Sequence, residues 1–235
     1  DDKIDDFFKK EQSKADRGKF TKYLKQLPSL DSLPVDHKAV KWAIGRKIPK
    51  EHYSILFYSE NFVEWTTQFT DKYGKIKHHD RIIIPFYDED GYPIYFQGRS
   101  FGNLEPRYFT YKISENHSKL YGMERVNQKN DIFVCEGPID SLYINNCVAI
   151  ASADLTTFEG GDVFVWDNEP RNSQICDLLL SAIKSGKRVV IWPIGILEKD
   201  VNDMFLAGYD VKSIVRDNVY SGSSALLKFN QWCKV

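Results

Sequence analysis

Carboxylates follow three apolar runs in the C-terminal part of the chain. The carboxylates are Glu136, Asp167, Glu169 and Asp200, and the runs that precede them are 132–135, 163–166 and 189–193. Apolar runs that alternate with helical segments predict βαβ units and a mostly parallel sheet. Pro138 is well placed as the first residue of the helix after the first run. Ligands of such sheets bind beyond the carboxyl ends of the strands, so we expect these side chains to converge on one edge.

Carboxylates that converge in this way repel one another, and a divalent cation is the usual reason for keeping them together. Oxygen ligands without nearby His or Cys suit Mg²⁺ or Mn²⁺, which bind carboxylates together with phosphate oxygens of a substrate. The corresponding chemistry is phosphoryl or nucleotidyl transfer. Acidic residues after strands are also common as turn residues and helix caps, and the pattern alone leaves that alternative open.

The N-terminal half is organised differently. Residues 1–27 are rich in Lys, Glu and Gln and predict a charged helix or arm, and 36–46 predicts a short helix that ends at Gly45. Residues 81–87 and 92–97, joined by the turn 88–91, predict a β-hairpin, and the alternating run 107–113 predicts a third strand. Aromatic side chains in these strands suit either stacking on nucleobases or a protein core.

Charge is distributed unevenly along the chain, although the net charge is −1. Residues 1–50 hold 13 Lys and Arg against 8 Asp and Glu, whereas residues 136–235 hold 9 against 13. The basic end suits a polyanion, and the acidic end suits cations. Arg81 and Arg99 flank the predicted hairpin, where a guanidinium can bind phosphate with two hydrogen bonds.

Other features exclude several classes of protein. The four cysteines, at positions 135, 147, 176 and 233, have no metal-ligand spacing, so we expect free thiols and no zinc site in this chain. No apolar run is long enough to span a membrane, and the acidic first residues are unlike a secretory signal. Since position 1 is Asp and not Met, we expect that a segment once preceded it.

The ordered motifs resemble a known family. The string IFVCEGPIDSL over 132–142, then Asp167-Asn168-Glu169 and the run KDVND over 199–203, resembles the TOPRIM domain of primases, topoisomerases and some nucleases. Upstream, RIIIPF over 81–86 and QGR over 97–99 resemble the basic strand module of bacterial-type DNA primases. The resemblance covers about residues 30–210. Among bacterial-type primases, the chain resembles those of tailed phages.

The resemblance implies an α/β protein in which a mixed α/β basic strand module precedes a Rossmann-like TOPRIM domain with a mostly parallel sheet. The implied parts are an N-terminal arm or helix over 1–29, the basic module over 30–125, the TOPRIM domain over 126–217, and a tail or helix over 218–235.

The resemblance also assigns roles to residues. Glu136, Asp167 and Glu169 match the catalytic and metal-binding acids, with Asp200 as a further metal ligand. The family usually has Asp where this chain has Glu169, which is one methylene longer and puts the preferred metal in question. The residues implied to bind nucleotide or template are Arg81, Arg99, Arg107, Lys199 and Asn202, and Asp140 and Asp203 are additional candidates. Asp140 equally suits a helix N-terminus.

The implied function is a DNA primase RNA-polymerase core that joins ribonucleoside triphosphates on single-stranded DNA, using Mg²⁺ or Mn²⁺, two ions in all. The implied partners are the template, the nucleotides and a replicative ring helicase, with no membrane, in the cytoplasm of a bacterium infected by a phage. Two alternatives remain: a TOPRIM nuclease or topoisomerase-related enzyme, and a catalytically inert TOPRIM module that binds DNA or a helicase.

Overall fold

The protein is described by a computed structural model that covers residues 18, 20–102, 104–113 and 119–235. The described residues fall into two compact units. Unit 1 lies within residues 1–45 and 49–119, and unit 2 consists of residues 46–48 and 120–235. The short segment Arg46–Ile48 therefore belongs to unit 2, although the chain on both sides of it belongs to unit 1.

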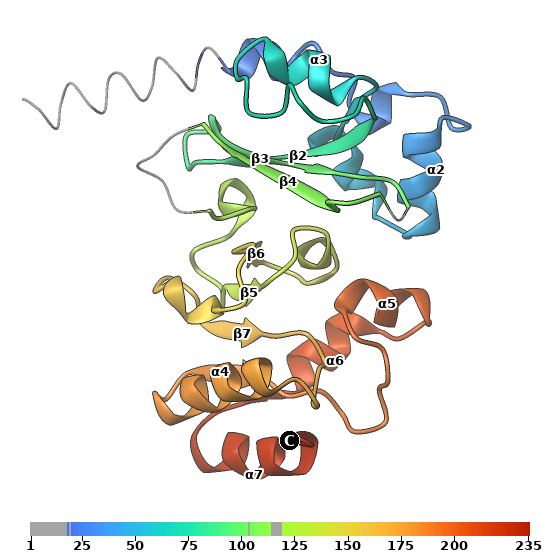
Figure 1. The fold of residues 1–235 in the computed structure, drawn as a ribbon. Helices are drawn as coiled ribbons and strands as arrows, with labels where there is room; N and C mark the ends of the chain where they lie inside the picture. Colours follow the sequence, from blue (N-terminus) through green and yellow to red (C-terminus); the bar gives the residue numbers. More distant parts are fainter. Residues whose placement is uncertain (1–17, 19, 103, 114–118) are drawn as a thin grey trace, which may run out of the picture. The chain divides into compact units, whose positions relative to one another are not determined.

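Unit 1 contains a four-stranded antiparallel sheet (Figure 1). Its strands, in their spatial order, are β1 (Phe57–Ser59), β2 (Arg81–Tyr87), β3 (Pro93–Arg99) and β4 (Tyr108–Lys112). The predicted hairpin and third strand are confirmed as β2, β3 and β4. The short strand β1 was not predicted, because three residues are too few to show an alternating pattern.

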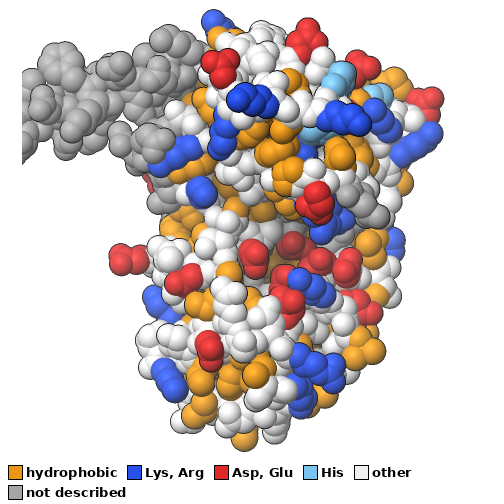
Figure 2. Space-filling model, viewed as in Figure 1, with side chains coloured by type: hydrophobic (Ala, Val, Ile, Leu, Met, Phe, Trp, Pro, Cys, Tyr) orange, Lys and Arg blue, Asp and Glu red, His pale blue; other side chains and the backbone are white. Residues whose placement is uncertain are grey.

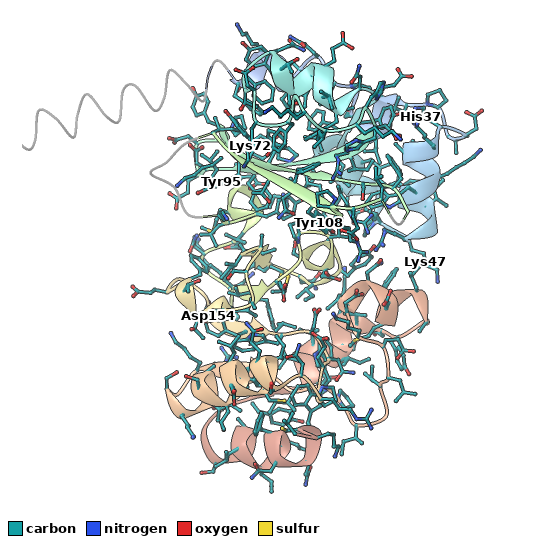
Figure 3. All side chains as sticks on the ribbon, viewed as in Figure 1. His37, Lys47, Lys72, Tyr95, Tyr108 and Asp154 are labelled. Atoms are coloured by element: carbon teal, nitrogen blue, oxygen red, sulfur yellow. The ribbon has the colours of Figure 1, made fainter. Side chains whose placement is uncertain are left out.

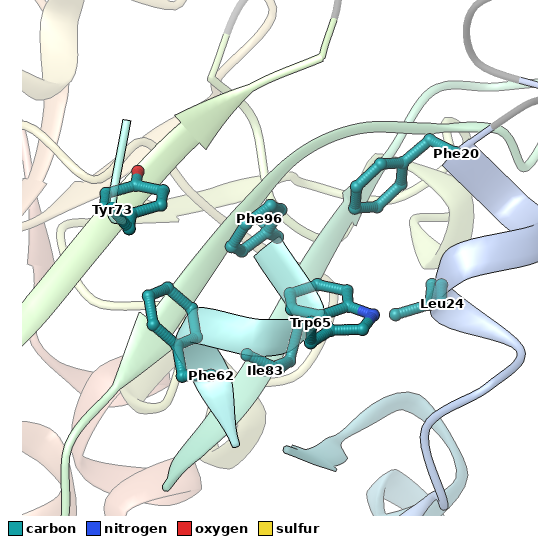
Figure 4. Close-up of a cluster of buried hydrophobic side chains, with 7 residues drawn as sticks. All are labelled: Phe20, Leu24, Phe62, Trp65, Tyr73, Ile83 and Phe96. Atoms are coloured by element: carbon teal, nitrogen blue, oxygen red, sulfur yellow. The ribbon is translucent and has the colours of Figure 1, made fainter. Parts of the chain in front are cut away.

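One face of this sheet is covered by an aromatic core (Figure 4). The buried members are Phe20, Leu24, Phe62, Trp65, Tyr73, Ile83 and Phe96, and partly buried side chains such as Phe109 and Tyr111 pack against them. The ring of Phe62 stacks on Phe109 at 5.7 Å between centroids, and that of Phe20 stacks on Phe96 at 5.6 Å. These strand aromatics therefore form a protein core, which is the second of the two alternatives that the sequence left open.

Besides the helical residues 20–24, the described part of unit 1 also contains two α-helices and two 3₁₀ turns. They are α2 (Lys38–Gly45), α3 (Phe62–Thr67) and the 3₁₀ turns Leu30–Ser32 and Lys50–Ile55. Helix α2 ends at Gly45 as predicted, although the left-handed backbone lies at Lys47, where φ is 53°. Of the predicted N-terminal arm, residues 1–17 and 19 lie outside the described residues, and 20–24 are helical.

Unit 2 contains the predicted, mostly parallel sheet. Its strands, in their spatial order, are β6 (Cys147–Ala149), β5 (Phe133–Cys135), β7 (Val163–Val165), β8 (Arg188–Val190) and β9 (Val219–Tyr220). The first four are parallel, and β9 is antiparallel to β8. The α/β fold class is thereby confirmed.

In unit 2, α-helices follow β7, β8 and β9, whereas only 3₁₀ turns follow β5 and β6. The helices are α4 (Ser173–Lys184), α5 (Val201–Leu206), α6 (Val211–Asp217) and α7 (Gly222–Trp232), and α7 packs against α4. The helix predicted to begin at Pro138 is wrong, because the chain forms only a 3₁₀ turn over Asp140–Tyr143. The connection from β5 to β6 is too short for a full crossover helix.

Further predictions concern boundaries, cysteines and membranes. The chain divides after residue 119, six residues before the end of the predicted basic module, and α7 within the predicted tail belongs to unit 2. The four cysteines are free, with the Sγ atoms of Cys135 and Cys147 3.7 Å apart. No helix among the described residues is long and apolar enough to cross a membrane.

Substitution of Gly98 tests the packing of unit 1. A Cβ atom at this position in β3 would lie 2.7 Å from Phe62 and 3.2 Å from Arg81, both of which are fully buried. We expect Gly98→Ala to lower the free energy of unfolding by about 1–3 kcal/mol through overpacking, as measured by denaturant titration. Gly45→Ala, where nothing lies within 4 Å, is the matched control and should be neutral or stabilising. Equal stability of the two variants would contradict the prediction.

Candidate active site

The parallel pairing of β5 and β7 brings the predicted acidic residues to one end of the sheet. Cys135 and Val165, the last residues of these strands, are register partners. Glu136 follows the first strand directly, and Asp167 follows the second after Trp166. Figure 2 shows Asp and Glu side chains gathered on one face of unit 2. The expected convergence of carboxylates at the carboxyl ends of the strands is therefore present.

The carboxylates interact through their charges. Burial, and then the negative charges of Asp140, Glu136 and Asp200, together raise the pKa of Asp167 to about 8, against the opposing charge of Lys199. Burial also raises the pKa of Glu136, with the charge of Glu169 acting in the same direction. Each effect requires these groups to lie near one another, so unit 2 has a cluster of carboxylates with too little positive charge to balance it.

Asp140 belongs to this cluster. Burial and then the charge of Asp200 raise its pKa to about 7, while the N–H of Asn202 donates to Oδ1 at 3.0 Å and lowers it. A Cβ atom at position 137 would collide with the carboxylate of Asp140, which explains the glycine after Glu136. Asp140 therefore faces the acidic edge and does not cap a long helix.

Lys199 and Asp203 lie near Asp200 at the acidic edge, and they make different contacts. Asp200 is the N-cap of α5, and its Oδ1 accepts the N–H of Asp203 at 2.7 Å, whereas the side chain of Asp203 is exposed. Lys199 pairs with Glu169 at 3.2 Å and is more than half exposed. An exposed lysine beside a carboxylate cluster can exchange that partner for an incoming phosphate group.

Asn202 is engaged inside unit 2. Its side chain is 1% exposed, and its Oδ1 accepts a hydrogen bond of 2.6 Å from Arg46. Its Nδ2 donates to the main-chain oxygen of Arg46 at 2.9 Å and to the Tyr143 hydroxyl at 2.8 Å. The Nζ atom of Lys47, a residue labelled in Figure 3, donates to the main-chain oxygen of Leu206 at 3.3 Å. These contacts connect segment 46–48 to the rest of unit 2, and they engage the side-chain amide of Asn202, which the resemblance implied to bind nucleotide or template.

Arg81 is likewise buried, in unit 1. It is fully inaccessible, and its guanidinium donates to His79, Gly98, Pro106 and Arg107. Its guanidinium carbon lies 4.2 Å from the centre of the Phe109 ring, and burial lowers the pKa of Arg81 to about 10. A guanidinium used in this way connects β2 with the loop before β4 and is not presented to a phosphate, so Arg81 is left out of the proposed ligand set.

Arg99 is 3% exposed and lies among aromatic side chains of the same unit, one of which, Tyr108, reaches solvent. Its Nε donates to the Tyr108 hydroxyl at 2.9 Å, and its guanidinium carbon is 4.8 Å from the centre of the Trp42 ring. Tyr108 is exposed (Figure 3), and Arg107 next to it is exposed as well. Cationic and aromatic groups of this kind are typical of surfaces that bind single-stranded nucleic acid.

Among the residues that the structure describes, no three His, Cys, Asp or Glu side chains are arranged closely enough to hold a metal ion as they stand. The chemistry of the cluster nevertheless fits a hard divalent cation, because the groups at this edge are oxygen ligands whose mutual repulsion opposes ionisation. The carboxylates of this cluster are Glu136, Asp140, Asp167, Glu169 and Asp200.

Asn168, which lies between the two predicted metal ligands, was missed as a site residue. It is 8% exposed, and its amide connects segment 196–199 with Trp232. Its position between Asp167 and Glu169 was the only signal in the sequence, and nothing there indicated that α7 would reach it.

Comparison with known proteins shows the class of protein to which the fold belongs. No family model matches the chain. The model is similar to the solved "DnaG primase catalytic domain bound to ssDNA", with a TM-score of 0.67 and 18% identity over 92% of this chain and 83% of that one. It is also similar to the Aquifex aeolicus primase (zinc-binding and RNA polymerase domains), with a TM-score of 0.54 and 17% identity over 77% of this chain and 55% of that one. The fold is that of a primase catalytic core.

A sequence relative identifies the family. The chain is 32% identical over 228 residues to the DNA primase of Enterobacteria phage T4, a match that covers 91% of this chain and 66% of the relative. The chain belongs to the DNA primase family, and it spans 66% of the length of that relative.

Replacement of Asp167 by Asn tests the electrostatic analysis without an activity assay. The pKa of Asp167 is about 8 in the fold and near 3.8 when unfolded, so its ionisation destabilises the fold progressively from about pH 4 to pH 8. We expect Asp167→Asn, without divalent cations, to raise the free energy of unfolding above pH 8 by at least about 1.4 kcal/mol, the equivalent of one pKa unit. The gain should vanish near pH 4.

The matched control is Asp131→Asn. Asp131 pairs with Arg188 at 2.8 Å, which lowers the pKa of the Asp131 carboxyl, so its loss should give no gain in stability at any pH. Unfolding curves measured between pH 4 and pH 9 make the comparison. A pH-independent effect of Asp167→Asn would count against the carboxylate cluster.

Proposed function

We propose that the chain is the RNA-polymerase core of a DNA primase, which joins ribonucleoside triphosphates on a single-stranded DNA template. The single observation that carries this proposal is the carboxylate cluster at the edge of the parallel sheet. Membership of the primase family supports it, and so does the likeness to a catalytic domain whose solved structure contains single-stranded DNA.

In this proposal Glu136, Asp167 and Glu169 are the catalytic acids, and together with Asp200 they hold two Mg²⁺ or Mn²⁺ ions. Bound ions of this kind polarise the α-phosphate and stabilise the attacking and leaving oxygens of nucleotidyl transfer. Asp140 adds negative charge from the interior of unit 2. The partly buried positions of Asp167 and Glu136 limit contact with water, which strengthens their hold on a cation.

The chain's cationic side chains bind the polyanions in this proposal. Lys199 lies beside the acidic edge through its contact with Glu169, and there it binds the phosphates of the incoming nucleotide. Arg99 and Arg107 contact template or nucleotide phosphates, beside the exposed ring of Tyr108, which suits stacking on a base. The family resemblance adds a replicative ring helicase as an expected partner and the cytoplasm of an infected bacterium as the expected location.

Primer synthesis by active-site variants tests the proposal. We expect Asp167→Asn and Glu169→Gln each to lower primer yield by about 100-fold or more, since each removes a cation ligand. The measurement is the formation of short labelled RNA from ribonucleotides on single-stranded DNA, with Mg²⁺ or Mn²⁺. Asp210→Asn is the control, because Asp210 caps α6 and Asn caps a helix equally well.

The outcomes separate the proposal from the alternatives. Yields like that of the unsubstituted chain from both active-site variants, at saturating Mg²⁺, would contradict the assignment of these acids. DNA binding without cation-dependent synthesis by the unsubstituted chain would favour the inert module, and cleavage of DNA in place of synthesis would favour the nuclease.

Replacement of Arg99 tests the proposed nucleic-acid surface. A lost phosphate contact makes the dependence of log affinity on log salt concentration shallower, by about 0.7 for single strands. We expect this change for Arg99→Ala in titrations with a labelled DNA oligonucleotide, with an unchanged requirement for Mg²⁺. Lys184→Ala, on the exposed end of α4 in unit 2, is the control. An unchanged salt dependence for Arg99→Ala would assign this residue to the packing of unit 1 alone.

A further inference from the structure

The main-chain N–H and the side-chain amide of Asn168 have partners within unit 2. Its main-chain N–H donates to the oxygen of Lys199 at 2.7 Å. Its Nδ2 donates to the main-chain oxygens of Ile196 and Glu198, both at 3.0 Å. Its Oδ1 accepts the indole N–H of Trp232 at 2.8 Å. Asn168 is thus held in place by several hydrogen bonds, and its neighbours in the chain, Asp167 and Glu169, are proposed cation ligands.

Three of these four hydrogen bonds run to one segment of the chain. That segment, 196–199, leads directly into Asp200, while Asn168 itself lies between Asp167 and Glu169. The bonds therefore determine how far the acids that follow β7 lie from the acid that begins α5. Cations that bridge the two groups need this spacing to be constant, because carboxylate positions set the geometry of a divalent site.

Trp232 determines which way the amide of Asn168 points. The oxygen and nitrogen of an Asn side chain are similar in size and exchange places when the last side-chain bond turns by half a revolution. An indole N–H is a donor only, so Trp232 requires the oxygen on its side and leaves the NH₂ group for the two carbonyls. Trp232 is 4% exposed, and water therefore has little access with which to replace its N–H.

The end of α7 supports the same loop at a second point. The main-chain N–H of Lys234 donates to the oxygen of Pro170 at 2.7 Å, next to Glu169. On the other side of the acids, the indole of Trp192 donates to the oxygen of Trp166 at 2.8 Å. The loop 166–170 is therefore held by Trp192, which follows β8, and by Trp232 and Lys234 at the end of α7 and just after it, as well as by its own strand. Helix α7 lies outside the motifs of the family resemblance.

We propose that Trp232 is a positioning residue of the acidic site: through Asn168 it maintains the spacing between Asp167 and Asp200 that cation binding requires. The inference rests on the proposed function, since it assigns these acids to cations. It extends the site to α7, in which the sequence analysis predicted no site residue.

Removal of the indole N–H tests the inference. Trp232→Phe keeps an aromatic ring and loses only the donor to Asn168. Its matched control is Trp65→Phe in unit 1, because the Trp65 indole is equally buried and donates to a protein oxygen, that of Tyr23, at 3.0 Å. Both variants should unfold at a somewhat lower temperature than the unsubstituted chain. Only Trp232→Phe should weaken cation binding.

Two titrations measure that effect. Binding of Mn²⁺, followed by electron paramagnetic resonance without nucleotide or DNA, should weaken by about tenfold in Trp232→Phe, the loss typical when a group that orients metal ligands is removed. The Mg²⁺ concentration for half-maximal primer synthesis should rise by about the same factor. Trp65→Phe should leave both quantities unchanged.

A double-mutant cycle separates positioning from packing. If Trp232 acts through Asn168, then Trp232→Phe should not weaken Mn²⁺ binding further in a chain that already carries Asn168→Ala. A loss of Mn²⁺ affinity that is the same in both backgrounds would overturn the inference.

The remaining outcomes distinguish this inference from the proposed function. Mn²⁺ binding by Trp232→Phe that equals that of the unsubstituted chain, whatever its unfolding temperature, overturns the inference and leaves the proposed function standing. Mn²⁺ binding without primer synthesis by the unsubstituted chain contradicts the proposed function, while the comparison between variants still decides the inference. Absence of Mn²⁺ binding to the unsubstituted chain contradicts both.

Discussion

Carboxylates that share one edge of a buried sheet repel one another, and the rest of unit 2 must hold them together against that repulsion. The pKa values of Asp167 and Asp140, about 8 and about 7, express this cost, because each records how strongly burial and neighbouring charge oppose ionisation. A fold gains nothing from such a cluster in the absence of a counter-charge. The repulsion is therefore the feature of the structure that points most directly to a bound cation.

The groups around the cluster oppose the repulsion by fixing positions more than by supplying charge. Lys199 is the cation that pairs with Glu169, and it lies largely in solvent. The main-chain N–H of Asn202 and the charge of Arg46 act on Asp140 from the interior. Asn168 connects the two acidic segments by hydrogen bonds to uncharged partners. Neutral hydrogen bonds leave the negative charge of the edge available for a cation while preventing the loops from separating.

Unit 1 uses its polar groups differently. Arg81 has its guanidinium surrounded by acceptors and stacked on Phe109, so a charged side chain here stabilises the connection between strands. Arg99 lies at the same end of the sheet, because it pairs with Ile82, the neighbour of Arg81, but its side chain points to the opposite face. There it contacts Trp42 and Tyr108, and Tyr108 reaches solvent. Two arginines that look equivalent in the sequence therefore have different partners: Arg81 contacts main-chain oxygens and Phe109, whereas Arg99 contacts Trp42 and the hydroxyl of the exposed Tyr108.

The sequence by itself determined the class of fold, the parallel arrangement of the C-terminal strands and the end of the sheet at which the acids lie. Those features follow from local patterns: apolar runs, turn residues and the position of each acid just after a strand. Only the tertiary structure decided that Arg81 and Asn202 are buried, that a 3₁₀ turn replaces the helix expected at Pro138, and that Trp232 contacts the acidic loop. Burial and contacts between distant segments depend on how elements pack, and the spacing of residues along the chain does not carry that information.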